Sequence, residues 1–211
     1  MLNEQYETIK TLMSYAVPKN KMEKARELLD EFQADPIALN LLQAFYSFLP
    51  EGDNDHIKTL LLVARKKGLF LICARTELGD YFYIVNRERA EFLGSCDEGI
   101  AEKDTLEFFD LPADGTGLDD PLAFPEYFPA RENPNICPVC FAANGELHQL
   151  GCPVESCPWC GGQLTYCNCR FEVLNKTELS EEEDLKILEK ALEEKGRIPF
   201  DPSNERPGYP V

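Results

Sequence analysis

The chain has 211 residues, and 44% of them are hydrophobic, which is enough apolar material for a globular core. Its formal net charge is −17, from 38 acidic and 21 basic residues. Such an acidic field repels a phosphate backbone at long range, so the composition disfavours nucleic acid as a partner.

The N-terminal region has apolar residues at helical spacing over residues 3–49. Pro18 separates a first helix from a second. The pair Asp35-Pro36 predicts the start of a third helix, because proline is favoured at the first helical position, and Pro50 predicts its end. We therefore expect three short helices in this region.

The hydrophobic period changes after these helices. We predict a fourth helix over residues 55–67, closed by Gly68. Three short runs rich in β-forming residues then follow, at 69–75, 81–86 and 90–96. These runs predict an antiparallel meander.

A short helix is predicted around residues 104–109. Together with the preceding elements it predicts a mixed α+β domain over residues 1–110. Residues 111–135 form a connector that carries five prolines among acids and aromatics. We favour the interpretation that its aromatic residues pack on the first domain. The alternative is a docking strip for a partner, formed by Phe124, Tyr127 and Phe128.

The segment from Cys137 to Cys169 holds seven of the nine cysteines and one of the two histidines. Its ligand spacing is C-x2-C, x7, H-x3-C, x4, C-x2-C, x6, C-x-C. These ligands are enough for two zinc ions, because a structural zinc takes four Cys or His ligands. We predict a double-zinc module over residues 136–175. Its ligands are Cys137, Cys140, His148, Cys152, Cys157, Cys160, Cys167 and Cys169.

The spacing allows two pairings of these ligands. In the sequential pairing, the first four ligands along the chain hold one ion and the last four hold the other. In the crossed pairing, the two C-x2-C pairs share one ion, which the short span between Cys152 and Cys157 makes difficult. The sequential pairing is favoured, with Cys167 and Cys169 on one face of a strand.

Other chemistries fit the segment less well. An odd number of clustered cysteines argues against disulfides, and the spacing matches neither a thioredoxin-like site nor the common ferredoxin patterns. A catalytic zinc keeps one position open for water, whereas this ligand set saturates two ions. Glu155 would act as a general base only if one site were open, and a solvated loop glutamate is the favoured interpretation. The sequence predicts no catalytic residue.

Four further residues have simple interpretations. His56 is expected to be exposed in the first turn of the fourth helix. Cys73, in an apolar strand, is expected to be a core thiol, and Cys96 a free thiol at a turn. Trp159 is either exposed for a partner or packed against the C-terminal helix.

The C-terminal region, residues 176–211, is predicted to contain one acidic helix and a tail. Ser180–Glu183 has the pattern of a capping box. A stripe of leucines over residues 185–192 follows, and Gly196 is expected to end the helix. The tail is either disordered or lies over the surface.

The knuckle CPWCGG resembles those of zinc ribbons and rubredoxin-like modules. The longer string HQLGCPVESCPWCGGQLTYCNC, followed by an acidic helix and KGRIPF, resembles a group of bacterial proteins of unassigned function. They share a pattern close to H-x-x-G-C-x-x-E-x-C-P-x-C-G-G-Q-L-x-x-C-x-C. The resemblance covers residues 137–200 and implies a bacterial, cytoplasmic, zinc-binding protein. It implies no substrate and no catalytic residue.

The sequence as a whole predicts an α+β protein, with a helical N-terminal region and small antiparallel sheet, a zinc-ribbon-like module and a C-terminal helix. No apolar stretch approaches the ~18 residues that cross a membrane, and the N-terminus lacks the regions of a signal peptide. We therefore expect a cytoplasmic location, where clustered cysteines bind metals more often than they form disulfides. The favoured function is a non-catalytic zinc-binding protein that contacts another protein. The alternatives are a nucleic-acid-associated zinc ribbon and a zinc hydrolase with one open site.

Overall fold

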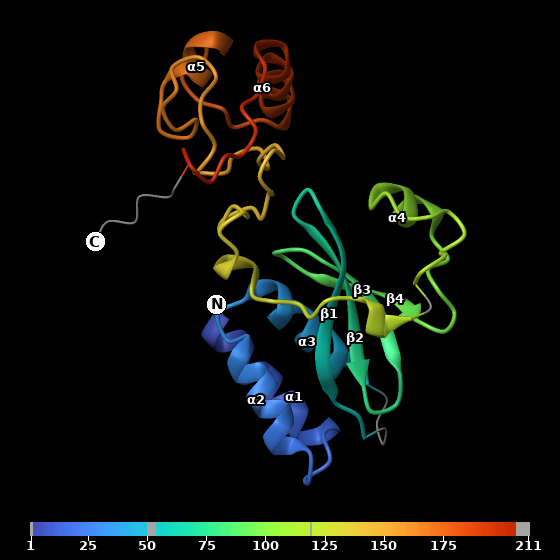
Figure 1. The fold of residues 1–211 in the computed structure, drawn as a ribbon. Coiled ribbons are helices and arrows are strands. Elements are labelled where there is room, and N and C mark those ends of the chain that lie inside the picture. The colour runs from blue at the N-terminus through green and yellow to red at the C-terminus, as the bar shows by residue number, and fades with distance from the viewer. Residues whose placement is uncertain (1, 50–53, 119, 206–211) are drawn as a thin grey trace. The chain divides into compact units, whose positions relative to one another are not determined.

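The computed structural model describes residues 2–49, 54–118 and 120–205. The chain divides into two compact units, residues 1–130 and 131–211. In the described residues, the first unit combines helices with a four-stranded antiparallel sheet, and the second holds the cysteine-rich segment and two helices (Figure 1). The α+β class predicted from the sequence is therefore confirmed.

Three helices begin the first unit: α1 (Leu2–Ala16), α2 (Met22–Glu31) and α3 (Pro36–Phe48). The predicted break at Pro18 and the predicted start at Asp35-Pro36 are both confirmed. Helix α3 is the most apolar of the three and buries most of its surface. Pro50, which was predicted to end α3, lies outside the described residues.

The sheet consists of β1 (Ile57–Lys66), β2 (Leu69–Thr76), β3 (Asp80–Val85) and β4 (Ala90–Ser95), in that order. The helix predicted over residues 55–67 is therefore wrong. Its apolar run is compatible with either state, and pairing with β2 decides for a strand. Lys67 and Gly68 have φ values of 50° and 76°, which form a tight two-residue hairpin turn. Gly68 thus closes a hairpin rather than a helix.

The sheet is covered on both faces. Alternate residues of β2 point to opposite sides, and almost the whole strand is buried. On one side, Leu71 and Cys73 pack with Leu106 of α4 (Lys103–Phe108), the short helix predicted at 104–109. On the other side, α3 contacts β3 and β4, and α2 contacts β1 (Figure 1).

The connector packs along the outer edge of β1. The N–H of Leu62 donates to the carbonyl of Pro125 at 2.9 Å, and the N–H of Tyr127 donates to the carbonyl of Leu60 at 2.8 Å. Tyr127 is buried, whereas Phe128 is 71% exposed. Phe124, just after the 3-10 helix η1 (Pro121–Ala123), packs against the core of the sheet. The packing interpretation therefore holds for Phe124 and Tyr127, and of the three aromatics only Phe128 remains available to a partner.

Asp35 ties α3 to the end of the connector. One of its carboxylate oxygens accepts the N–H groups of Ile37 and Ala38, both at 2.9 Å, and so caps the helix. The other accepts the N–H of Ala130 at 2.7 Å, and the hydroxyl of Tyr127 donates to the carboxylate at 3.1 Å. Burial raises the pKa of Asp35, and these hydrogen bonds act against that rise.

Replacing Asp35 with alanine should lower the free energy of unfolding of the first unit by about 2–4 kcal/mol. The change removes a helix cap and leaves two buried donors without an acceptor. Urea denaturation followed by circular dichroism measures the loss. Asp120→Ala is the matched control, because Asp120 caps only the exposed η1 by accepting the N–H of Leu122. Equal losses in the two variants would contradict this role for Asp35.

The second unit consists of two cysteine knuckles, helix α5 (Cys169–Leu174), helix α6 (Glu182–Lys195) and an extended tail. Helix α6 begins one residue later than the predicted capping box requires. Its N-cap is Glu181, and no side chain caps it, so the capping box is wrong. Gly196 ends the helix as predicted. Leu188 and Leu192 are buried, but the stripe is shorter than predicted because Leu185 is exposed.

Candidate metal centres

The structure gathers the predicted ligands into two separate tetrads. Within each tetrad, the four ligand atoms all lie within 4.8 Å of one another. The first tetrad is Cys137, Cys140, His148 and Cys152. The second tetrad is Cys157, Cys160, Cys167 and Cys169. This grouping is that of the sequential pairing and not that of the crossed one.

Each tetrad takes its first two ligands from a knuckle, and the two knuckles repeat each other twenty residues apart. The N–H of Phe141 donates to the carbonyl of Cys137 at 2.9 Å, and the N–H of Gly161 donates to the carbonyl of Cys157 at 2.8 Å. Phe141 and Gly161 both have positive φ values, 61° and 73°. A glycine adopts this conformation without strain, so the second knuckle forms more easily than the first.

The remaining two ligands of each tetrad arrive differently. In the first tetrad, His148 and Cys152 lie in a loop with a turn between the carbonyl of Gln149 and the N–H of Cys152. In the second tetrad, Cys167 precedes α5 and Cys169 is its first residue. The strand predicted for Cys167 and Cys169 is therefore wrong. The start of helix α5, and not a strand, brings the sulfurs of Cys167 and Cys169 to the same candidate metal site.

His148 is held so that one ring nitrogen faces the thiols. Its Nδ1 lies 3.2 Å from Sγ of Cys140, and its Nε2 lies 3.1 Å from a carboxylate oxygen of Glu205. The other oxygen of Glu205 accepts the N–H of Ser156 at 3.1 Å. A carboxylate behind a histidine ligand fixes the ring orientation and makes the ligand nitrogen more basic.

Hydrogen bonds within the first tetrad shift the pKa values of Cys140, Cys152 and His148. Hydrogen bonds from Cys137 and Cys152 hold the pKa of Cys140 well below its usual range, while bonds to Cys137 and Cys140 raise the pKa of Cys152. Burial lowers the pKa of His148, but hydrogen bonds to Cys137, Cys140 and Glu205 outweigh it and raise that pKa to about 10. A soft dication fits this donor set, because its charge replaces the shared protons and binding releases them.

Glu155 is a buried residue and not the solvated loop glutamate favoured from the sequence. Its carboxylate is 1% exposed and accepts from the guanidinium of Arg197 at 2.7 and 2.8 Å. Arg197 also donates to the carbonyl of His148 at 2.7 Å. Glu155 is buried because the tail, which carries Arg197, returns to the loop that holds the first tetrad. Burial raises the pKa of Glu155, and Arg197 opposes that rise.

Replacing Glu205 with glutamine should weaken metal binding at the first tetrad by about 10–100-fold, because the charged group that orients His148 is lost. Competition with a chelator of known affinity, followed by metal analysis, measures the change. Glu189→Gln is the control, since it makes the same change of charge on an exposed position of α6. An unchanged affinity in Glu205→Gln would contradict this role.

The remaining cysteines and the second histidine lie in the first unit. Cys73 is buried as predicted, and its Sγ lies 3.3 Å from Sγ of Cys96, which is also buried. His56 precedes β1 and is buried, so its predicted exposure in a helix turn is wrong. None of these three belongs to a candidate metal cluster among the described residues.

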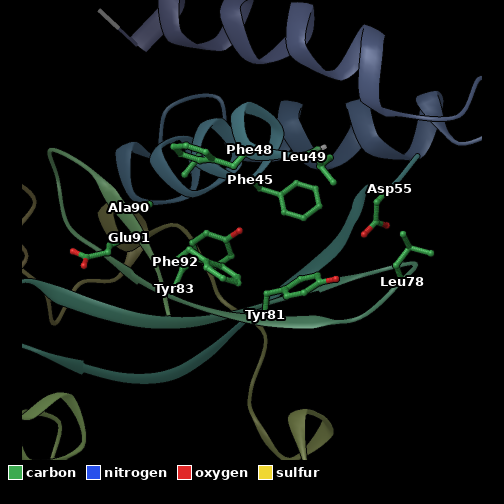
Figure 2. A pocket seen from close by; sticks show the side chains of 11 residues that line it. Phe45, Phe48, Leu49, Asp55, Leu78, Tyr81, Tyr83, Ala90, Glu91 and Phe92 are labelled. Carbon is green, nitrogen blue, oxygen red and sulfur yellow. The ribbon is translucent and has the colours of Figure 1, made fainter. Parts of the chain in front are cut away.

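An apolar pocket of about 640 Å³ lies in the first unit between α3 and the strands β3 and β4 (Figure 2). The rings of Phe45, Tyr81 and Phe92 approach one another across it. Asp55, one of its two carboxylates, is held by the N–H groups of His56 and Glu77. Its described lining is mostly aromatic and aliphatic, with the carboxylates of Asp55 and Glu91 as the charged groups, a composition typical of a small-molecule binding pocket.

Sequence reasoning missed Arg197, Phe200 and Glu205 as parts of the first centre. The motif KGRIPF was visible, but the separation of about fifty residues from His148 gave no indication that the two segments meet. Among the described residues, no helix is long and apolar enough to span a bilayer. No protein-family model, no curated protein and no solved structure matches this chain.

Proposed function

We propose that this chain is a zinc-binding protein with two structural zinc ions in its second unit. The observation that carries this proposal is the pair of tetrads, each with four soft ligand atoms within 4.8 Å of one another. For tetrahedral zinc with Zn–S bonds of about 2.3 Å, geometry requires about 3.8 Å between sulfurs. The sulfurs of Cys137 and Cys152 are 3.8 Å apart. Iron would also accept four thiolates, but His148 in the first tetrad favours zinc.

Both centres are proposed to be non-catalytic. Each supplies four protein ligands, and a catalytic zinc needs an open position for water. Glu155, the residue that the sequence analysis named as a general base if one site were open, forms an ion pair with Arg197. These contacts count against the zinc hydrolase that the sequence left as an alternative.

The module is proposed to act through another protein and not through nucleic acid. Arg170 is the one basic residue within 136–175, Lys176 follows directly, and both are used internally. Arg170 donates to the carbonyls of Leu164 and Cys167, and Lys176 pairs with Asp184. With a net charge of −17, a basic or neutral protein surface is the expected partner, and binding should weaken as salt rises. The resemblance to bacterial zinc-binding proteins is consistent with a cytoplasmic role of this kind.

Elemental mass spectrometry on protein purified under reducing conditions, without added metal, tests the proposal. We expect two zinc ions per chain. Cys73→Ser should leave this number unchanged, because Cys73 is a buried thiol of the other unit. Fewer than two zinc ions, or iron in their place, would contradict the proposal. A retained complex in a gel shift at low salt would favour the nucleic-acid alternative.

A further inference from the structure

The two tetrads differ sharply in their access to solvent. Every ligand of the first tetrad is at most 4% exposed. In the second tetrad Cys157 is fully buried, but Cys160 is exposed, and Cys167 and Cys169 are half-buried. A small molecule in solution can therefore reach sulfur atoms of the second tetrad and not those of the first.

The first tetrad is buried because the tail lies over it. Phe200 is paired through its main chain, with its N–H donating to the carbonyl of Glu146 at 2.8 Å and its carbonyl accepting from Gly145 at 2.9 Å. Its ring packs edge-on against His148, with 5.3 Å between ring centres. Glu205, five residues further along, binds the outer nitrogen of the same histidine. The tail thus supplies both an apolar cover and a polar anchor.

Among the described residues, a leucine cluster behind Cys157 supports the second tetrad. Leu164, Leu188 and Leu192 pack behind Cys157, with Trp159 against the same cluster. Cys160 and the two glycines that follow it are exposed. Four thiolates also leave a bound dication with a net charge of −2, one unit more negative than three thiolates and a histidine. Exposed thiolates of this kind are the ones that exchange ligands and react.

We propose that the second tetrad is an exchangeable metal site, whereas the first tetrad retains its ion. At the second tetrad, small chelators bind the ion and thiol-reactive molecules react with the cysteine sulfurs. The inference rests on the proposed zinc function. In the exchange step, an incoming chelator replaces the cysteine sulfurs on the ion, and the released thiolates take up protons from water. The site therefore passes metal to, or receives it from, other soft ligands, and the first tetrad holds its own loop and the tail in place meanwhile.

Chelator-driven release of zinc from the full chain tests the proposal. The chromophoric chelator 4-(2-pyridylazo)resorcinol reports each ion as it leaves. Samples taken during the reaction are treated with iodoacetamide, whose iodide is displaced by any free cysteine sulfur, and the labelled peptides are identified by mass spectrometry. We expect one equivalent of zinc to leave at least about tenfold faster than the other. Labels should appear at Cys160, Cys167 and Cys169 before they appear at Cys137, Cys140 and Cys152.

The possible failures are distinguishable. Two zinc ions that leave at one rate, or labels that appear first on the first tetrad, would overturn the exchange proposal and leave the proposed function intact. Fewer than two zinc ions at the start would overturn both.

A variant tests the physical cause. Phe200→Ala removes the cover of the first tetrad, so the slow phase should accelerate and the fast phase should keep its rate. Ile198→Ala is the control, because Ile198 lies in the same tail and is 36% exposed. If the slow phase has the same rate in the wild type and in Phe200→Ala, the tail does not protect the first ion.

Discussion

Removal of both metal ions should unfold the second unit and leave the first one folded. The core of the second unit is small, and the ligands themselves are a large part of it. Around the first tetrad, the buried cluster consists of three cysteine ligands with Ala142, Val154 and Phe200. So few apolar side chains do not offset the entropy of ordering the chain. Zinc binding contributes about 10–16 kcal/mol per structural site, which is enough to fold such a unit.

The fluorescence of Trp159 measures this transition selectively. Trp159 is the chain's single tryptophan, and it packs against Cys157, Leu164 and α6 within the second unit. Incubation with EDTA under reducing conditions should shift its emission to the red as the side chain becomes solvated, and added zinc should reverse the shift.

The first unit provides the internal control for metal removal. Cys73 and Cys96 are buried in the core below its sheet and should stay unreactive to iodoacetamide throughout. Labelling of these two thiols on metal removal would show that the units unfold together. An unchanged Trp159 emission would show that the second unit folds without metal.

Cys157→Ser should lose one metal ion and release α6 from its packing. Cys157 is fully buried and belongs to one cluster with Leu164, Leu188 and Leu192, so it is both a ligand and a core residue. A serine oxygen is a poor ligand for zinc beside three thiolates. The expected result is one zinc ion per chain instead of two, with a lower melting temperature for the transition that Trp159 reports.

The comparison that isolates the ligand role is Cys73→Ser. That change makes the same chemical substitution at a fully buried cysteine outside both tetrads. It should lower the stability of the first unit and leave both metal ions bound. Two zinc ions per chain and a native melting curve in Cys157→Ser would count against the second tetrad as a metal site.

The sequence determined the parts of this protein that depend on local chemistry. The identity and spacing of the eight soft ligands could be read without coordinates, because two C-x2-C turns and short loops bring neighbours in the chain together. The capped start of α3 and the glycine end of α6 were equally local. The sequential grouping follows from the same short range, since each tetrad closes within about sixteen residues.

Features that depend on contacts between distant segments were decided by the tertiary structure. The run at residues 57–66 is apolar enough for a helix, and it became β1 because β2 supplies a partner for its backbone groups. His56 and Glu155 were predicted to be exposed, but both are buried. Their burial depends on contacts with distant segments, which no local sequence pattern reveals. The unequal access to the two tetrads has the same origin. The two ligand sets look alike in the sequence, but the described part of the tail returns to the first tetrad, because Phe200 and Glu205 contact His148 across some fifty residues of chain.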